Sequence, residues 1–423
     1  MQPYPLDPTA ADHHGEAAAL RALGPVVPVV LPGGVPAWAV TRHDLLTSVL
    51  HHPDISKNPR HWRAVRERKL PDGWPLTGMV MVTNMVTADG ADHRRLRRLV
   101  TTTLTSARVR AMRPEMTALA NALAQALPSH SDTGVVDLRA HYAYPLPMRV
   151  ICDLVGVPDQ DRPRLRELVE SIFSSVATPD EVTTTQHDIH RLLGQLVADR
   201  TRHPADDLTS ALIAARATDP TGLSDDELAG TLWLLISAGH ETTLSLITNA
   251  VRALLTHPAQ LDWVLHHARE ELTVRAAGQP VRTHHSVWDA VIEETLRWDA
   301  PIGNFLARYP TTDLTLAGTT IPEGDAILAP YSLVNRDPDQ HGPTADLFDV
   351  TRPQARHLAF GGGPHFCLGA SLARTEAAIA LDTLFTHWPG IRLAVPDRTL
   401  TPVPSLITNS VTTLPIHLGP EHQ

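Results

Sequence analysis

Residues 360–369 read FGGGPHFCLG and form the most informative stretch of the chain. The consecutive glycines let the backbone approach a flat partner closely, because they carry no side chain. Cys367 follows them, where the loop is predicted to enter a helix. Free amides and the partial positive charge at a helix N-terminus lower the pKa of a thiol and favour the thiolate. The stretch therefore predicts an anionic cysteine ligand for a metal.

Two other interpretations of this loop do not fit its residues. Glycine loops before helices often bind phosphate, but the dinucleotide pattern G-x-G-x-x-G fails because Phe366 occupies the third glycine position. A purely structural turn would require neither His365 nor Cys367. The residue types therefore favour an anionic metal ligand over a nucleotide site.

The same residues carry a family resemblance. The stretch matches the haem-binding signature of the cytochrome P450 family, F-G-x-G-x-H-x-C-x-G, at every position, and 372–376 continue it as L-A-R-x-E, as in bacterial members. The resemblance implies a mainly α fold with a small β portion, a triangular helical prism around a long central helix. It also implies haem b as cofactor, with Cys367 as the axial ligand of the haem iron.

Composition and charge are consistent with that class and exclude others. The chain has 423 residues, 43% of them hydrophobic and 19% charged, so it is neither disordered nor a coiled coil. The formal charge of −10 gives no electrostatic basis for binding nucleic acid. No apolar run reaches the roughly 18 residues of a membrane span, and the first 21 residues lack a secretion signal. We expect a cytoplasmic, monomeric protein with a single domain over residues 1–423.

The chain contains only two cysteines, Cys152 and Cys367. This count excludes a disulfide framework and any all-cysteine zinc or iron–sulfur site. Cys152 lies in the apolar stretch 150–155 and is interpreted as a small core residue.

Hydrophobic patterns outline the fold. Apolar runs at 26–31 and 37–40 flank a Gly-Gly turn and predict a β-hairpin. A second hairpin is expected from 313–321 and 326–329 around Pro-Glu-Gly at 322–324. Helical spacing extends from 92 to about 127 and again between 138 and 215. A last helix is expected from 368 to about 387, followed by a β-like pair around 405–415.

The central helix is predicted from Ser224 to Thr256. Ser224 and Glu227 form a capping box at its start, and His257-Pro258 ends it. Its middle is apolar nearly all round, which predicts a buried position.

Polar residues interrupt this helix at 238–243, which read AGHETT. Gly239 costs about 1 kcal/mol relative to alanine inside a helix, so a compensating role is expected. A zinc-protease motif is excluded because Leu244 stands where H-E-x-x-H needs its second histidine. The resemblance implies an oxygen-binding kink beside the haem at Ala238 and Gly239, with Glu241 and Thr242 as the catalytic acid–alcohol pair that delivers protons. The structural alternative is a threonine bonded to the preceding turn and a glutamate at a solvated bend.

Basic residues are expected to bind the two haem propionates. The run at 92–99 reads DHRRLRRL and alone would be a solvated basic helix face. Within the family, His93 and Arg97 match one propionate-binding pair because they lie four residues apart on one face. Arg308 and His365 match the remaining contacts. The full predicted cofactor-binding set is His93, Arg97, Ala238, Gly239, Arg308, Phe360, Gly361, His365, Cys367 and Gly369.

Two further sets of residues are interpreted through the family. Glu294 and Arg297, with Arg352, are expected to form a buried brace for the haem loop. The arginines at 94, 95, 98 and 374 are expected to form a basic patch for an acidic ferredoxin.

The implied activity is monooxygenation with dioxygen. No flavin or nicotinamide fingerprint is visible, so electrons are expected from a separate ferredoxin and its NAD(P)H-dependent ferredoxin reductase. The pocket is expected to be lined by 74–86, 173–179, Leu235, Ala238, 302–306 and 406–407. These residues are mostly aliphatic and predict a large apolar small-molecule substrate such as a macrolide, another polyketide or a steroid.

Two other classes stay open from the sequence. A haem-thiolate enzyme that uses peroxide, or that couples or rearranges its substrate, would keep Cys367 but often lacks the acid–alcohol pair. A non-catalytic haem-binding or gas-sensing protein would need neither that pair nor a substrate loop.

Overall fold

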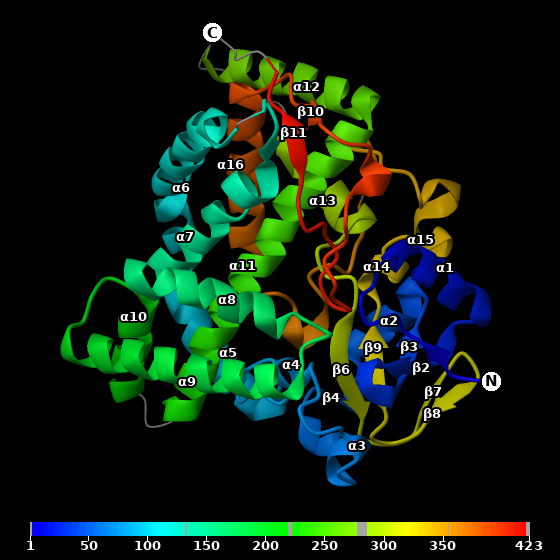
Figure 1. Ribbon diagram of the computed structural model, residues 1–423. Helices are drawn as coiled ribbons and strands as arrows, with labels where there is room; N and C mark the ends of the chain where they lie inside the picture. Colours follow the sequence, from blue (N-terminus) through cyan, green and yellow to red (C-terminus); the bar gives the residue numbers. More distant parts are fainter. Residues whose placement is uncertain (1, 132, 219–221, 277–285, 354, 420–423) are drawn as a thin grey trace.

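The long helix α11 organises the molecule. The computed structural model describes residues 2–131, 133–218, 222–276, 286–353 and 355–419. Helix α11 spans Asp225–Thr256 and begins with the predicted capping box: Ser224 Oγ accepts from the Glu227 amide at 3.1 Å, and Glu227 accepts from the Ser224 amide at 2.9 Å. It contacts the surrounding helices on several sides, which explains its apolar circumference (Figure 1).

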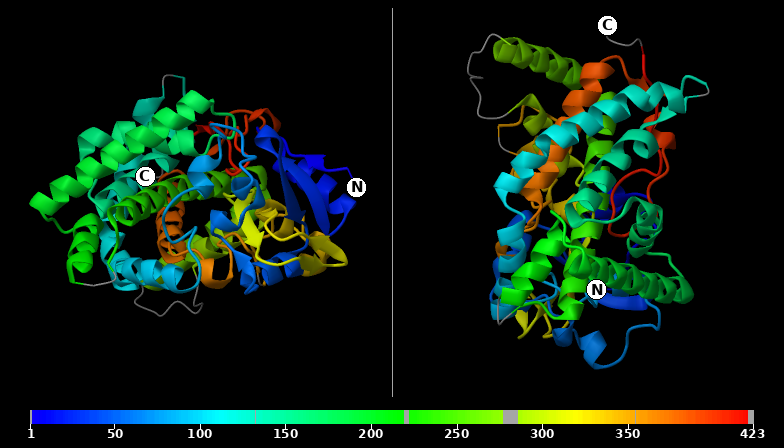
Figure 2. Two further views of the ribbon diagram at one scale, coloured as in Figure 1. Left: turned by 90° about the horizontal axis from the view of Figure 1, so that it is seen from below. Right: turned by 90° about the vertical axis from the view of Figure 1, so that its left-hand side faces the viewer.

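The remaining helices surround α11, with the largest β-sheet to one side (Figures 1 and 2). The helices are α1 His13–Leu23, α2 His43–His51, α3 Arg63–Arg66, α4 Thr77–Val80, α5 Gly90–Thr103, α6 Ser106–Ala126, α7 Pro145–Val155, α8 Arg162–Ile172, α9 Pro179–Arg202, α10 Leu208–Thr218, α12 Pro258–Ala276, α13 Val287–Trp298, α14 Tyr331–Val334, α15 Pro338–His341 and α16 Ala370–His387. A π-helical turn, η4, spans Arg139–Ala143 before α7. The architecture is mainly α with a small β portion, as predicted.

The largest sheet has the strand order β1-β2-β3-β9-β6-β4, and β10-β11-β5 and β7-β8 form smaller ones. The strands are β1 Tyr4–Pro5, β2 Val26–Leu31, β3 Val35–Val40, β4 Ile55–Ser56, β5 Val136–Asp137, β6 Phe305–Pro310, β7 Leu314–Leu316, β8 Thr319–Ile321, β9 Ala326–Ala329, β10 Arg392–Leu393 and β11 Pro415–His417. The predicted first hairpin is confirmed, because β2 and β3 pair antiparallel from Val26↔Val40 to Leu31↔Val35.

The predicted position of the turn in the second hairpin is wrong. The hairpin β7–β8 reverses at Ala317 and Gly318, which both have positive φ, of 46° and 80°. Such φ values match the right-handed twist of paired strands, as in two-residue turns. Strand β9 instead joins the large sheet between β3 and β6.

Helical spacing between 92 and 127 resolves into two helices, α5 and α6. The chain changes direction at Leu104, and Thr105 Oγ1 caps α6 by accepting from the Arg108 amide at 3.2 Å. In place of the β-like pair expected at 405–415, the described residues form two isolated bridges, Pro402↔Val411 and Ile302↔Thr408, and β11 at the end of the segment belongs to a sheet.

Candidate active site

A cavity of about 260 Å³ lies between α11 and the loop at 360–369. It gathers side chains from α5, α7, α11, β6 and the start of α16, which are distant in sequence. Its wall contains eleven of the twelve residues predicted for the site: His93, Arg97, Ala238, Gly239, Thr242, Arg308, Phe360, Gly361, His365, Cys367 and Gly369. The fold therefore brings these eleven predicted residues together around a single cavity.

The loop at 360–369 presents Cys367 to this cavity. The Cys367 amide donates to the Phe360 carbonyl at 2.9 Å and closes the loop. Gly361 has φ +68°, a conformation that favours glycine, and a Cβ there would lie 3.4 Å from Tyr331 Oη. Helix α16 begins at Ala370, so the thiol lies just before its N-terminus. Burial raises the pKa of the Cys367 thiol, while the Gly369 amide and Arg97 act in the opposite direction.

Basic groups concentrate at one side of the cavity. The rings of His93 and His365 lie 4.3 Å apart, and Arg97 Nη2 donates to the Phe366 carbonyl at 2.8 Å. His93 Nε2 and Arg308 Nη1 are buried and have no hydrogen-bond partner within the described residues. Burial, followed by the charges expected on His365 and Arg97, lowers the pKa of His93 to about 4.

This donor set fits the group that the sequence implies. Buried donors without acceptors need an acceptor ligand, and carboxylates are the strongest acceptors for arginine and histidine. A flat macrocycle with two carboxylates would place them against His93 and Arg308 and its metal beside Cys367. The residues present therefore fit haem b.

Helix α11 forms the opposite wall and stays helical through the predicted kink. Thr242 faces the cavity, and its Oγ1 donates to the Ala238 carbonyl at 2.6 Å, which is the back-bonded arrangement. A Cβ on Gly239 would lie 2.8 Å from Ile151 Cδ1, so any larger residue would displace Ile151 of α7. The close approach of α7 explains the glycine in the helix interior.

Glu241 is the predicted site residue that does not reach the cavity. Glu241 is absent from the described residues that line the cavity. It is 4% exposed and faces η4, with Oε1 3.6 Å from Arg139 Nη2 and 3.5 Å from Ser245 Oγ. Burial raises the pKa of Glu241 to about 7, although Arg139 opposes the rise. Its partner Arg139 was missed because no local pattern links η4 to α11.

His240 lies on the same buried side of α11. Its ring contacts the Tyr144 ring edge-on, with centroids 4.7 Å apart, and neither ring nitrogen has a hydrogen-bond partner among the described residues. Burial, with Arg139 nearby, lowers the pKa of His240 to about 3. The histidine is therefore neutral at physiological pH.

The rest of the cavity wall is mostly apolar. Met85, Val86, Leu235, Ile302 and Phe305 line it as predicted. The wall also contains residues that the sequence did not assign to it: Lys57, Leu104, Ile151, Leu154 and Leu234.

Parts of the expected lining belong elsewhere. Trp74 is buried against Trp62, with its indole nitrogen donating to Pro32. Leu406 and Ile407 are fully buried and absent from the described cavity wall. Ser175 Oγ accepts from the Leu406 amide at 2.6 Å, which attaches the segment after α8 to the C-terminal region.

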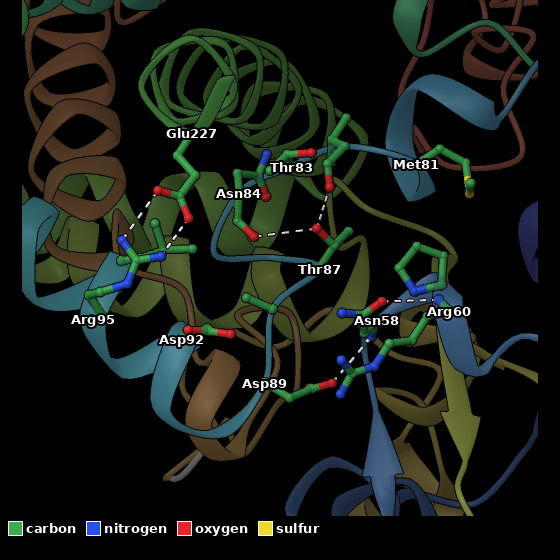
Figure 3. Close-up of a pocket in the computed structure, with 14 residues that line it drawn as sticks. Asn58, Arg60, Met81, Thr83, Asn84, Thr87, Asp89, Asp92, Arg95 and Glu227 are labelled. Carbon is green, nitrogen blue, oxygen red and sulfur yellow. Dashed lines mark hydrogen bonds and ion pairs between the residues drawn. The ribbon is translucent and has the colours of Figure 1, made fainter. Parts of the chain in front are cut away.

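A second, polar cavity of about 410 Å³ lies at the start of α11 (Figure 3). Arg95 crosses it to Glu227, with Nη2 2.5 Å from Oε1. Asp89 lines the same cavity and accepts from the Lys57 amide at 3.0 Å. Arg95 therefore does not belong to the basic patch expected for a ferredoxin. Arg374 is likewise paired, with Glu293 at 2.6 Å.

The expected brace is present beneath the loop. Arg297 is fully buried and donates to both carboxylate oxygens of Glu294 at 2.7 Å. It also donates to the carbonyls of Ala345 and Leu347 at 2.7 and 2.8 Å, and Arg352 Nε lies 3.3 Å from Glu294 Oε2. These bonds fasten α13 to the irregular segment that leads into the loop.

Comparisons with known proteins agree with this geometry. The cytochrome P450 family model matches residues 22–389. The chain is 37% identical to 2-hydroxy-5-methyl-1-naphthoate 7-hydroxylase of Streptomyces carzinostaticus, over 99% of this chain and 98% of the relative. It is 35% identical to vitamin D(3) 25-hydroxylase of Pseudonocardia autotrophica, over 96% and 94%. It is 43% identical to the solved "Testerone bound CYP154C4 from Streptomyces sp. ATCC 11861", over 100% of both chains with a TM-score of 0.91.

P450 enzymes of this kind contain haem b, act on small molecules with dioxygen and need redox partners. Among the described residues, no helix is long and apolar enough to cross a bilayer. The fold, the cavity beside Cys367 and the matches over nearly the whole chain lead to one conclusion: this protein belongs to the cytochrome P450 family and is a monooxygenase.

Proposed function

We propose that this enzyme hydroxylates or epoxidises a large, apolar, multi-ring or macrocyclic small molecule, of the macrolide, polyketide or steroid type. The observation that carries the proposal is the apolar wall formed by Met85, Leu235, Ile302 and Phe305 in the same cavity as Cys367. Aliphatic walls select substrates by shape and apolar area. A naphthoate, vitamin D(3) and the ligand of the CYP154C4 neighbour are the ring compounds named for similar proteins.

Haem b would be held by residues of this chain. When bound, it supplies the redox chemistry that activates dioxygen. We assign Cys367 as its axial ligand, and His93, Arg97, Arg308 and His365 as donors to its propionates. The remaining predicted residues shape the space for the ring: Ala238, Gly239, Phe360, Gly361 and Gly369.

Thr242 and Glu241 are the proposed proton-delivery residues. Thr242 Oγ1 faces the cavity and can hold a proton donor there. Glu241, with its pKa near 7, can exchange protons at physiological pH behind the same helix turn. Because Glu241 points toward Arg139, delivery would require a change of its rotamer or an intervening water.

We propose a ferredoxin as the electron donor. Arg94 and Arg98 are exposed on α5, and Phe366 beside Cys367 is 43% exposed. Arg97 joins α5 to the loop through Phe366, so these basic and apolar groups adjoin the thiolate side of the site. An acidic ferredoxin would complement this surface.

The second candidate function is peroxide-driven oxidation or oxidative coupling with the same haem-thiolate site. The observation that favours it is the position of Glu241 outside the cavity wall. Gas sensing without turnover is disfavoured by the apolar substrate-sized space.

One experiment tests these proposals together. Purified holoenzyme is screened with macrolide, polyketide and steroid compounds for the spectral shift that follows displacement of the water ligand of the iron. Each binder is then incubated with ferredoxin, its reductase and NAD(P)H, or with hydrogen peroxide alone. Oxygenated product in the first incubation, at a rate that falls as salt rises, supports the proposal. Product only with peroxide would establish the second candidate, and binding without product in either would contradict both.

We further propose a single-domain, monomeric, cytoplasmic protein that binds no nucleic acid. Its buried apolar residues form one core from the N-terminal sheet to α16, and the formal charge is −10. Size-exclusion chromatography with light scattering tests the monomer.

A further inference from the structure

Lys57 is an unusual residue of the cavity wall. The sequence contains only two lysines, and this one is 5% exposed, directly after β4. Its Nζ donates to the Leu306 carbonyl at 3.1 Å and lies 4.7 Å from the centroid of the Phe305 ring. An ammonium has three protons to donate, and a buried one is costly without an anionic partner. One carbonyl and one ring face leave that requirement unmet.

The nearby carboxylate, Asp89, is occupied by other donors. It accepts from Ser56 Oγ, from the backbone amides of Lys57 and Asn58, and lies 3.8 Å from His365 Nε2. Burial raises the pKa of Asp89, but the nearby His365 and the hydrogen bonds from Ser56 and Lys57 outweigh this and lower it. Within the described residues, the Lys57 ammonium therefore has no carboxylate in direct contact.

The surrounding charges are unbalanced. Lys57, Arg97 and Arg308 supply positive charge to this side of the cavity, and Asp89 is the carboxylate that faces them. A protonated Lys57 together with the two guanidinium groups would carry more positive charge than Asp89 can balance. Burial and then Arg308 lower the pKa of Lys57 well below its usual range, while Asp89 opposes the change. An anionic ligand beside Lys57 would oppose this fall in its pKa and favour the ammonium form.

We propose that Lys57 is a further haem-binding residue, which donates to a propionate carboxylate beside Arg308. The proposal rests on the haem placement described above and adds a cation that the sequence motifs did not indicate. A structural lysine with no anionic ligand would be replaceable by methionine without loss, because an apolar side chain avoids the desolvation cost.

The test uses the substrate-free holoenzyme and three variants. Lys57→Met removes the charge at similar length, and Lys57→Arg keeps it. Lys69→Met is the matched control, because the second lysine is 71% exposed in its side chain and pairs with Glu67. The readouts are the propionate bending band in the resonance Raman spectrum and the rate of haem transfer to an excess of a high-affinity apoprotein.

Lys57→Met is expected to shift the propionate band and to accelerate haem loss roughly ten- to a hundredfold, the range for losing one charge-assisted hydrogen bond. Lys57→Arg should stay close to the wild type in haem loss, and Lys69→Met should match it in both readouts. If Lys57→Met yields no holoprotein, Lys57→Gln carries the same expectations.

An unshifted propionate band in Lys57→Met would overturn the proposal, whether or not haem loss changes. A change that emerges only when a carboxylate-bearing ligand is added would assign Lys57 to the substrate and overturn it as well. Failure of the haem placement itself would be recognised separately. In that case the reduced carbon monoxide complex of the wild type would lack the red-shifted band of thiolate ligation.

Discussion

Thr242 and Glu241 are adjacent in sequence but face different surroundings. Consecutive residues of an α-helix point about 100° apart, because a turn contains 3.6 residues. Thr242 therefore lines the cavity, whereas Glu241 packs toward Arg139 of η4, outside the cavity wall. The two residues should differ in what their substitution changes.

Removing the hydroxyl of Thr242 should uncouple electron use from product. We expect Thr242→Ala to bind haem and substrate, to keep oxidising NAD(P)H, and to lose at least about tenfold in product, since a positioned proton donor typically contributes about 10²–10⁴-fold. The missing electrons should be found as hydrogen peroxide. The measurement is the ratio of product and of peroxide to NAD(P)H oxidised, with Thr242→Ser as the control that retains a hydroxyl. Full coupling in Thr242→Ala would show that protons arrive by another route.

Glu241 should determine the pH dependence of turnover. Its protonated form, the proton donor, predominates below its pKa of about 7. Product formation at saturating substrate should therefore fall as pH rises through about 7. Glu241→Gln should slow turnover and remove this inflection. An inflection that persists in the variant would belong to another group.

At the scale of elements, one arginine connects α13 to the segment before the haem loop. Arg297 has carboxylate and carbonyl acceptors in a dry environment, so its removal leaves a buried carboxylate and several carbonyls without donors. Breaking a buried pair in this way costs about 3–5 kcal/mol. Arg297→Ala should therefore yield little holoprotein.

The conservative and surface variants make this prediction specific. Arg297→Lys should also be poor, because an ammonium cannot reproduce the planar fork toward Glu294. Arg149→Lys, at an exposed i,i+4 pair, should be neutral. The measurement is the haem-to-protein ratio and the thermal midpoint of each variant. A normal yield for Arg297→Ala would show that the haem loop does not depend on this brace.

At the scale of the whole molecule, buried carboxyl groups should make stability fall toward high pH. Glu376 in α16 is 1% exposed, its Oε1 has no partner within the described residues, and burial raises its pKa to about 8. A carboxyl whose pKa is higher in the folded state stabilises the fold fully below its unfolded pKa of about 4.5. The contribution of Glu376 to the free energy of unfolding should then decrease by about 1.4 kcal/mol per pH unit until pH reaches about 8.

Glu376→Gln should remove this contribution to the pH dependence, since an amide carries no charge at any pH in that range. The measurement is the urea midpoint of wild type and variant at pH 5.5 and pH 8, with the exposed Glu115→Gln as control. A parallel loss of stability in the wild type and in Glu376→Gln would contradict the assignment of this dependence to Glu376.

The sequence alone was sufficient where the governing interactions are local. The capping box at Ser224, the first hairpin and the ten-residue loop around Cys367 are encoded within short stretches, and the structure forms the helix, the hairpin and the loop at those positions. The second hairpin was misplaced because Pro-Glu-Gly and Ala-Gly are both turn sequences. The choice between them depends on β9 pairing with β3, almost three hundred residues earlier.

The family signature and its associated motifs thus predicted, from sequence, eleven residues that line the cavity beside Cys367. Only the tertiary structure decided which charges meet: Arg95 with Glu227, Glu241 with Arg139, and Lys57 with the side of the cavity that carries Arg308. The physical reason is that low-dielectric surroundings strengthen each electrostatic contact. The energy of a buried charge therefore depends on whichever groups the fold places within a few ångströms. Such neighbours come from elements far apart in the chain, and the residue pattern within one element does not indicate them.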